Sequence, residues 1–268
     1  MAQGLCLEEA CLDGVLHFLE PQPDDYIARI LCYPRKDCQV LQERLETLLE
    51  EGFVYFVECC TNVMGLRILG KGYTGVTVLA FHKSHGLGAL KLLRVDSRRE
   101  SLAREAEMLT RVQPSGLAPV LYSYGDFYLF RELVPLHACA PIDEYLARLL
   151  RGGMHEEVKR VLLEVLHGFY RVDLLGVDHT EIGRPRGHVF YCKSGLRVID
   201  WESARVSNKP GNLTSFTSFL IFRFREAGKL QQVLSYDARE VLKALRLYKQ
   251  SYSESAFRGV LASLRLLQ

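Results

Sequence analysis

The sequence predicts a two-lobed α+β fold in which a β-rich half is followed by a helical half. Between residues 53 and 134, short apolar runs rich in Val, Leu, Phe and Tyr surround a single helix-like segment. From residue 141 onward, apolar residues recur with the 3.6-residue period of helices, interrupted by one hairpin-like pattern at 188–199. Strand signals and helix signals are therefore segregated along the chain, which is typical of the α+β class.

Length and composition indicate an ordinary globular protein. The 268 residues can form one large domain or two small ones, and 48% are hydrophobic and 25% charged. No apolar run approaches the roughly 18 residues that span a bilayer, and the N-terminus lacks the basic region of a secretory signal. We therefore expect a cytoplasmic protein without a membrane partner. A net charge of +2 does not indicate nucleic-acid binding by itself, but it leaves room for a local basic patch.

The chain has eight cysteines, and none of them form a Cys-x-x-Cys pair, which argues against a zinc ribbon. We expect buried, small apolar side chains, with disulfides as the alternative if the source is a hyperthermophile. No catalytic role is assigned to them. Their positions are Cys6, Cys11, Cys32, Cys38, Cys59, Cys60, Cys139 and Cys192.

Residues 1–60 are expected to form an accessory module whose composition indicates no function. Helical spacing followed by two prolines predicts a first helix through Leu12, Val15, Leu16 and Leu19. A second helix is predicted to be capped by Asp37, to run to about Glu51 and to stop at Gly52. A strand is predicted at 53–57.

A glycine-rich turn lies between two strand-like runs within residues 66–80. Its G-x-G-x-x-G pattern also marks dinucleotide-binding domains, but those place it between a strand and a helix. Here the chain continues as a strand, which favours the nucleotide lid of kinases. Without Cβ atoms, backbone N–H groups can approach a triphosphate. Tyr73 at the tip either covers ATP or stacks on a base. The predicted nucleotide-binding residues are Gly70, Lys71, Gly72, Tyr73, Thr74 and Gly75.

Lys91 lies within the apolar strand 88–93 and requires a partner, because an unpaired buried ammonium is costly. The alternative is an edge lysine that reaches solvent. In the helix predicted at 97–112, Glu105 falls on the apolar stripe and points inward. In kinases, a lysine on a strand forms an ion pair with a glutamate on a helix, and this pair orients the ATP phosphates.

Two further strands are predicted at 120–124 and 127–130, and the second runs into Glu132 and Val134. In kinases such a strand leads to the hinge, whose backbone binds adenine. The alternative is that this is an ordinary strand of the sheet. With this assignment the first lobe covers residues 61–134 and the second covers 135–268.

The most polar part of the second lobe precedes a predicted hairpin. Runs at 188–191 and 196–199 are joined by a Lys-Ser-Gly turn, which brings His188 near Asp200. Carboxylates, imidazoles and guanidiniums crowded on loops are typical of phosphate and metal sites, although a charged surface hairpin is the alternative. The loop ahead of the hairpin contributes Asp178, His179, Glu181, Arg184 and Arg186.

Taken together, these features resemble the protein-kinase-like superfamily over about residues 66–225, and its atypical RIO-like branch in particular. The strings GKGYTGV, DSRRESLAREAEML, GVDH, RPRGHV and IDWESA are similar to an archaeal group described as serine/threonine kinases, which includes an archaeal RNA kinase that phosphorylates tRNA on a ribose hydroxyl. The resemblance implies a two-lobed kinase-like fold, ATP and Mg²⁺ as cofactors, and tRNA or another structured RNA as substrate. A RIO-like serine/threonine protein kinase and a non-catalytic nucleotide-binding scaffold are the alternatives.

The resemblance also implies roles for individual residues. Asp200 matches the metal-binding aspartate of the Asp-Phe-Gly motif, although here it begins Asp-Trp-Glu. His188 occupies the slot of the metal-binding asparagine and is alternatively a phosphate contact. Asp178 is the candidate catalytic base. It lies ten residues before His188 rather than the usual five, where Gly183 stands, so Glu181 remains a competing base.

No Ala-Pro-Glu motif follows Asp200, so the usual peptide platform of protein kinases is missing. We expect the basic residues around the loop to contact RNA phosphates, which supply much of RNA affinity. These are Arg184, Arg186, Lys193, Arg197, Arg205 and Lys209. A second basic stripe, for which a solvated helix face is the alternative, comprises Arg239, Lys243, Arg246 and Lys249.

Overall fold

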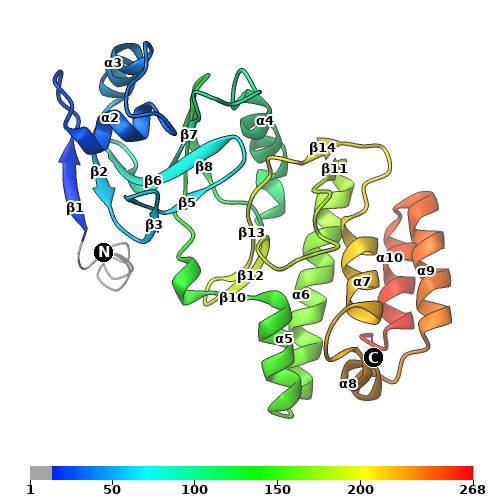
Figure 1. Ribbon diagram of the computed structural model, residues 1–268. Helices are drawn as coiled ribbons and strands as arrows, with labels where there is room; N and C mark the ends of the chain where they lie inside the picture. The colour runs from blue at the N-terminus through cyan, green and yellow to red at the C-terminus, as the bar shows by residue number, and fades with distance from the viewer. Residues whose placement is uncertain (1–13, 268) are drawn as a thin grey trace. The chain divides into compact units, whose positions relative to one another are not determined.

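A computed structural model describes residues 14–267 and is α+β, with antiparallel sheets, as the sequence predicts (Figure 1). The chain divides into two compact units. The first runs to Glu107 and resumes over Pro119–Pro135, and the second contains Met108–Ala118 and everything from Leu136 onward. Cys6, Cys11 and Leu12 lie outside the described residues. Within 14–267, no helix is both long and apolar enough to cross a membrane.

The first unit is built on a seven-stranded sheet with the order β1-β2-β6-β7-β9-β8, with β5 paired to β6. Its strands are β1 Val15–Phe18, β2 Phe53–Glu58, β5 Gly70–Lys71, β6 Gly75–His82, β7 Gly86–Leu93, β8 Leu121–Tyr124 and β9 Tyr128–Arg131. A separate hairpin consists of β3 Thr61–Val63 and β4 Leu66–Ile68. Because β2 pairs with β6, the front segment and the predicted first lobe share one sheet.

The core of this unit lies between one sheet face and two short helices, α2 Asp25–Leu31 and α3 Leu41–Glu51. Most residues of β6 and β7 are buried, so side chains on both faces of these strands pack against other parts of the protein. Burial of these side chains drives the helices onto the sheet, since apolar area removed from water contributes about 25 cal/mol per Å². The cluster includes Ile27, Ile30, Leu45, Leu48, Phe53, Phe56, Val76, Val78, Leu90 and Phe130.

Two predictions for the front segment are wrong. The run ending at Leu19 forms β1, not a helix, with Val15 opposite Glu58. A helix this short is marginal in isolation, whereas pairing with β2 satisfies the backbone. The helix predicted from Asp37 begins at Leu41 with Val40 as its N-cap. Its predicted end is confirmed, because Gly52 adopts a left-handed φ of 100° as the C-cap.

Helix α4, Ala103–Val112, starts later than the predicted Ser97. Just before Ser97, Arg94 is paired with Asp96 at 2.8 Å, and just before the helix the Leu102 N–H donates to the carbonyl of Asp126. Glu105 therefore lies in the first turn of α4, close to the sheet that carries Lys91.

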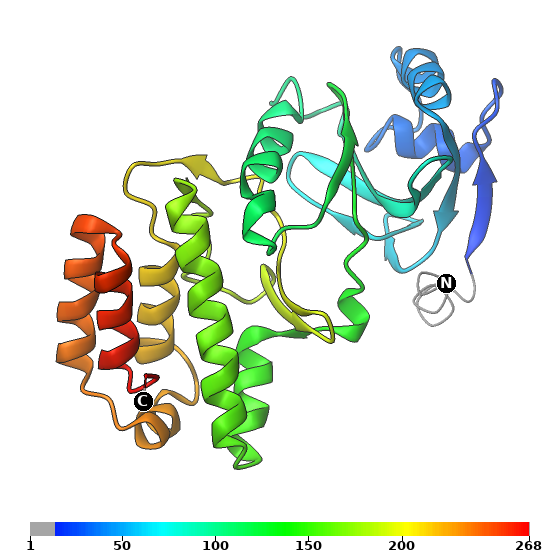
Figure 2. The ribbon, with the colours of Figure 1, turned by 180° about the vertical axis from the view of Figure 1, so that it is seen from behind.

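The second unit is mostly helical, as predicted. Its helices are α5 Ile142–Arg151, α6 His155–Leu174, α7 Asn212–Phe222, α8 Ala227–Leu234, α9 Ala238–Ser251 and α10 Glu254–Ser263. Helix α6 runs beside α7, and α9 lies beside α10 (Figures 1 and 2). Two one-turn 3₁₀ helices, Gln113–Ser115 and Leu136–Ala138, complete the described helices.

Short strands in the second unit hold the polar loops. The predicted hairpin is confirmed as β12 Val189–Cys192 and β13 Gly195–Val198, with Val189 opposite Val198, and β10 Ala140–Pro141 pairs with β12. A second ladder joins β11 Val177–Asp178 to β14 Arg205–Val206.

Four of the described cysteines form disulfides. For these four, the alternative prediction of disulfides is confirmed rather than the expectation of buried thiols. The pairs are Cys32–Cys38 and Cys139–Cys192. The second pair ties the segment before β10 to the end of β12.

Candidate functional site

The glycine turn is a tight hairpin between β5 and β6. It is closed by a 2.8 Å hydrogen bond from the Gly72 N–H to the carbonyl of Gly75. A Cβ on Gly75 would lie 2.9 Å from the Leu92 carbonyl oxygen and from Lys91 Cε, so only glycine fits there. Nothing lies within 4 Å of a Cβ built on Gly70. The turn therefore packs directly on the strand that carries Lys91.

The tip of the turn has one exposed and one buried side chain. Tyr73 is 72% exposed at the tip, whereas Thr74 is fully buried. The Thr74 hydroxyl has no hydrogen-bond partner among the described residues. A buried polar atom without a partner is costly, and this one marks a place where a ligand or water can bind. The exposed Lys71 lies on β5.

The predicted ion pair is present. Lys91 Nζ donates to Glu105 Oε2 at 2.6 Å, and the two side chains are 8% and 5% exposed. Strand β7 places the lysine between Thr77 on β6 and Leu129 on β9, and α4 presents the glutamate to it. A buried pair of this kind holds a cation in a fixed position, which is what binding a polyphosphate requires.

The predicted hinge follows β9. Glu132 is tied to the neighbouring chain segment twice, because its N–H donates to the Val120 carbonyl at 2.8 Å and its carboxylate accepts from the Val120 N–H at 3.1 Å. Val134 is buried. The Glu132 N–H is thus used inside the protein.

In the second unit, three predicted site residues converge. One ligand atom each from Glu181, His188 and Asp200 lies within 4.8 Å of the others. His188 Nε2 is 4.0 Å from the Glu181 carboxylate, and His188 Nδ1 is 4.0 Å from the Asp200 carboxylate. His188 Nδ1 is buried and has no hydrogen-bond partner among the described residues. An imidazole between two carboxylates is a donor set that fits a divalent cation.

The candidate metal ligand Asp200 and Thr180, the residue before Glu181, have a backbone conformation that is uncommon for a non-glycine residue. Thr180 and Asp200 have φ values of 70° and 64°. Such conformations cost free energy and cluster at functional sites. At Asp200 the turn occurs between β13 and Trp201, whose indole N–H donates to the Val198 carbonyl at 3.0 Å.

Asp178 is not part of this three-residue cluster. Its carboxylate accepts from the Thr180 N–H at 3.2 Å and lies 3.5 Å from the Arg205 guanidinium across the β11–β14 ladder. Its side chain is 15% exposed. Of the two predicted bases, Glu181 therefore lies with the candidate metal ligands, and Asp178 remains separate and partly open to solvent.

A buried network that the sequence analysis missed holds this loop. Asn212 at the start of α7 accepts from the His179 N–H at 2.9 Å and donates to the Val177 carbonyl at 2.6 Å. The Asp173 carboxylate in turn accepts from Asn212 Nδ2 at 2.8 Å and from the Tyr248 hydroxyl at 2.8 Å. Asn212 thus positions the backbone on both sides of Asp178, and Asp173 holds Asn212 in place. The sequence signal that could have revealed this network was Asp173, a carboxylate on the apolar stripe of α6.

Burial shifts the protonation of two members of this region in opposite directions. It raises the pKa of Asp173 to about 6, against the effect of the hydrogen bonds from Tyr248 and Asn212. It lowers the pKa of His179 to about 4. His179 is therefore neutral at pH 7, with Nε2 3.1 Å from the Ile199 carbonyl and its ring packed on Trp201.

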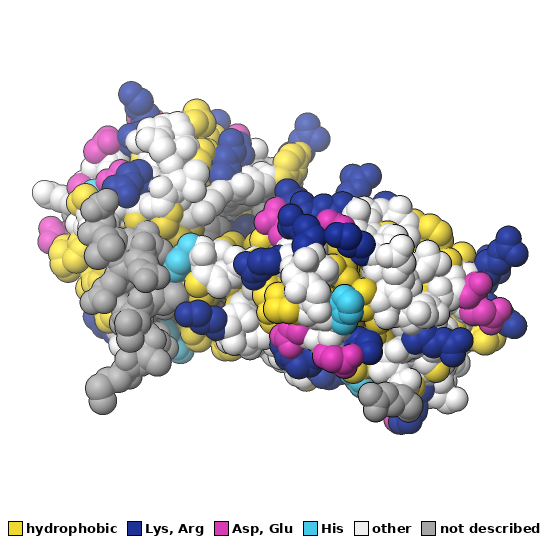
Figure 3. All heavy atoms as spheres, turned by 90° about the horizontal axis from the view of Figure 1, so that it is seen from below, with side chains coloured by type: hydrophobic (Ala, Val, Ile, Leu, Met, Phe, Trp, Pro, Cys, Tyr) yellow, Lys and Arg dark blue, Asp and Glu magenta, His cyan; other side chains and the backbone are white. Residues whose placement is uncertain are grey.

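The predicted RNA-contacting cations differ in availability. Arg186 is paired with Asp143 and Glu144 on α5, and Arg205 with Asp178. Arg184 is exposed, and its N–H donates to the Glu181 carbonyl at 2.8 Å, so it belongs to the same turn as the cluster. Exposed Lys193 lies in the β12–β13 turn and exposed Lys209 ahead of α7, and half-buried Arg197 lies on β13. On the face shown in Figure 3, basic side chains are spread among neutral, apolar and acidic ones.

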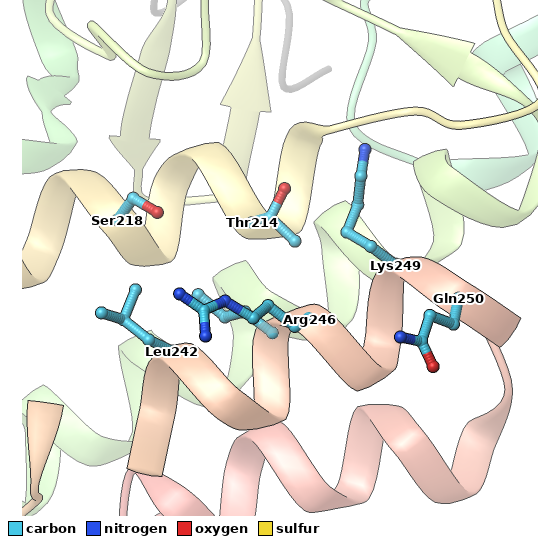
Figure 4. Close-up of a pocket in the computed structure, with 7 residues that line it drawn as sticks. Thr214, Ser218, Leu242, Arg246, Lys249 and Gln250 are labelled. Atoms are coloured by element: carbon cyan, nitrogen blue, oxygen red, sulfur yellow. The ribbon is translucent and has the colours of Figure 1, made fainter. Parts of the chain in front are cut away.

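Two residues of the second basic stripe, Arg246 and Lys249, line a groove of about 420 Å³ between α7 and α9. Figure 4 shows Thr214 and Ser218 on one side and Arg246 and Lys249 on the other. The Lys249 ammonium donates to the carbonyls of Lys209 and Pro210, each at 2.9 Å, so it fixes the loop before α7. Arg246 is exposed.

The sequence matches no protein-family model and no curated protein.

Proposed function

We propose that the protein is an ATP-dependent phosphotransferase of the kinase-like type and that it phosphorylates a hydroxyl of RNA, namely a ribose 2′-OH of tRNA. The observation that carries the phosphotransferase part is that the first unit has a buried Lys91–Glu105 ion pair beneath a glycine turn and the second unit has a Glu181–His188–Asp200 cluster. A cation for the phosphates and a ligand set for a divalent metal are the two components that phosphoryl transfer needs.

In this proposal each residue has a defined task. Lys91, held by Glu105, binds the α- and β-phosphates under the turn Gly70–Gly75. Glu181, His188 and Asp200 would hold a divalent metal ion, which would supply positive charge to neutralise the phosphates. Asp178 orients the acceptor hydroxyl and takes its proton. The acceptor oxygen then forms a bond to the γ-phosphorus, the bond to the β–γ bridging oxygen breaks, and ADP leaves.

Three features favour RNA over protein as the acceptor. The segment between Asp200 and α7 is short and contains β14, so it offers little surface for a peptide. Arg184 and Lys209 are exposed cations on loops of the same unit. Folded RNA meets such cations through its phosphates and presents ribose hydroxyls. The resemblance of the sequence to an archaeal RNA kinase group supports the same choice.

Incubation of the full-length protein with γ-labelled ATP and bulk tRNA, with a basic protein, or with neither tests this proposal. We expect label in tRNA. Alkali cleaves RNA through the 2′-OH, so phosphorylation of that hydroxyl leaves a labelled, alkali-resistant dinucleotide. Label removed as a mononucleotide by alkali would contradict the 2′-OH assignment. Label in the basic protein alone would identify a protein kinase, and binding of ATP without any transfer would identify a scaffold.

Arg184→Glu tests the RNA surface and has a matched control. Arg258 on α10 is also exposed, so Arg258→Glu makes the same change in net charge. We expect Arg184→Glu to raise KM for tRNA much more than KM for ATP, and Arg258→Glu to leave both near the wild-type values. Activity on tRNA should fall steeply with salt concentration. Equal effects of the two variants would contradict a role for Arg184 in RNA binding.

A further inference from the structure

The groove between α7 and α9 combines apolar, hydroxyl and basic side chains. Its volume of about 420 Å³ lies in the range of about 300–1,000 Å³ that small-ligand sites occupy. Leu242 and Leu245 on α9 supply apolar surface, and Thr214 and Ser218 on α7 supply hydroxyls. Among residues 14–267, the side chains that line the groove include two cations and no carboxylate. Its charge therefore favours an anionic ligand over a cationic one.

Two polar groups in the groove are available to a ligand. Within residues 14–267, no hydrogen bond or ion pair involves the exposed Arg246 guanidinium or the half-buried Ser218 hydroxyl. Thr214 differs, because its hydroxyl donates to the Gly211 carbonyl at 3.1 Å. Figure 4 shows Ser218 and Arg246 on the two facing helices. A guanidinium and a hydroxyl that enter one groove from opposite sides form a donor set suited to a phosphate group.

The same two helices hold the loop that carries Asp178. The second cation of the groove, Lys249, donates to the carbonyls of Lys209 and Pro210, each at 2.9 Å, so its ammonium is already used within the protein. Two residues after Pro210, α7 begins at Asn212, which is hydrogen-bonded to the backbone on both sides of Asp178. A ligand in the groove is therefore held at a defined distance from Asp178.

We propose that the α7–α9 groove binds one nucleotide of the RNA substrate at a distance from the acceptor ribose. Its phosphate is bound by Arg246 and Ser218, and its base or ribose packs on Leu242 and Leu245. Phosphate contacts of this kind position a nucleic acid, and apolar contact tolerates any base. Because the groove and Asp178 are held by the same helix, the bound nucleotide determines which other nucleotide of the folded RNA presents its 2′-OH. This inference rests on the proposed function.

Photocrosslinking locates the RNA without reference to activity. The photoreactive amino acid p-benzoylphenylalanine replaces Gln250, which is exposed and lines the groove, or Glu240, which is exposed on α9 but does not line it. Each full-length protein is irradiated with labelled tRNA in the absence of ATP. We expect a crosslink from position 250 to a few neighbouring nucleotides and little from position 240. Binding of tRNA without a crosslink at 250, or equal crosslinking from both positions, would overturn the groove and leave the proposed function standing.

Two substitutions in the groove test the phosphate contact, and tRNA binding by each variant is measured over a range of salt concentrations. Arg246→Gln should weaken binding several-fold, lower the slope of log Kd against log salt by about 1, and leave ATP affinity unchanged. Ser218→Glu places a carboxylate opposite Arg246 and should also weaken binding. Its matched control is Ser255→Glu, which makes the same charge change at an exposed position of α10. An unchanged salt slope in Arg246→Gln, or equal losses in the two Ser→Glu variants, would overturn the contact.

Mapping the phosphorylated nucleotide tests the selection of the acceptor. The wild type should label one position of tRNA, and Arg246→Gln should spread the label over several positions, because its RNA is no longer anchored in the groove. Label at the same single position in both proteins would overturn the selection. A protein that binds no tRNA at any salt concentration would overturn this inference together with the RNA part of the proposed function.

Discussion

Lys91 and Glu105 form a 2.6 Å ion pair in which both side chains are less than a tenth exposed. Removing one partner of such a pair leaves a buried charge uncompensated, whereas replacing both with apolar residues is often tolerated. The pair can therefore be tested for function separately from its contribution to folding.

Lys91→Ala should lower the free energy of unfolding by about 3–5 kcal/mol, because Glu105 remains buried without its partner. The double variant Lys91→Met with Glu105→Leu should recover most of that loss in urea denaturation. Both variants should lack phosphate transfer, since neither has a cation for the phosphates. Transfer by the double variant at the wild-type rate would contradict the assignment of Lys91.

The two ends of the glycine turn provide a matched pair. Gly75→Ala should lower stability by about 1–3 kcal/mol and weaken ATP binding, because its Cβ would lie 2.9 Å from the Leu92 carbonyl oxygen. Gly70→Ala has open space and should be neutral or slightly stabilising, by up to about 1 kcal/mol. Thermal unfolding and ATP titration measure both. Similar losses in the two variants would mean that the close approach at Gly75 is not the cause.

The Glu181–His188–Asp200 cluster should prefer Mn²⁺ to Mg²⁺, because imidazole is a better ligand for Mn²⁺ and Mg²⁺ favours oxygen. His188→Asn exchanges the ring nitrogen for an amide oxygen. We expect it to shift the ratio of the two dissociation constants toward Mg²⁺ by about tenfold, or 1.4 kcal/mol. Calorimetric titration of each metal without nucleotide measures this. Asp200→Asn is the control and should weaken both metals, and an unchanged ratio in His188→Asn would remove His188 from the ligand set.

Asp173 and His179 should give opposing pH dependences of stability. The pKa of Asp173 is raised to about 6, so the folded protein holds a proton that the unfolded chain loses near pH 4. The stabilisation of the folded protein that this proton gives therefore falls as pH rises from about 4 to 6. The pKa of His179 is lowered to about 4, so its contribution is present above pH 6.5 and is lost as pH falls. The two largely cancel between pH 4 and 6.

Asp173→Asn should therefore reveal the pH dependence of stability that His179 alone causes. Stability of this variant, measured by urea denaturation, should rise by up to about 1.4 kcal/mol per pH unit between pH 4 and 6. His179→Gln should show the opposite slope over the same range. A variant Asp173→Asn with the same pH profile as the wild type would contradict the raised pKa of Asp173.

Local sequence patterns were sufficient to predict a contact where the chemistry of one side chain required a particular partner. A lysine in an apolar strand must be answered by an acid, and Glu105 was the acid on the buried stripe of the next helix. The hairpin that joins His188 to Asp200 followed from two short apolar runs and a glycine-containing turn. The helices of the second unit followed from long periodic patterns, which are the most reliable sequence signal.

The same reasoning failed for features that depend on contacts between residues far apart in the sequence. Residues 15–18 pair with a strand about forty residues later, and this pairing outweighs their helical spacing. Arg186 is paired with α5, also some forty residues away, so its proximity to the loop in sequence overstated its availability. Asn212 and Asp173 form their network through tertiary packing, which neither composition nor spacing reveals.

The pairing of β2 with β6 makes residues 53–58 an interior strand of the sheet rather than a detachable appendage. Deleting the front segment would leave the Leu79–His82 part of β6, which is mostly buried, as an open edge, and such edges recruit other chains. A shortened protein that starts at the glycine turn should consequently aggregate rather than fold. The smallest piece of the first unit that can be expressed on its own therefore has to begin at or before β2.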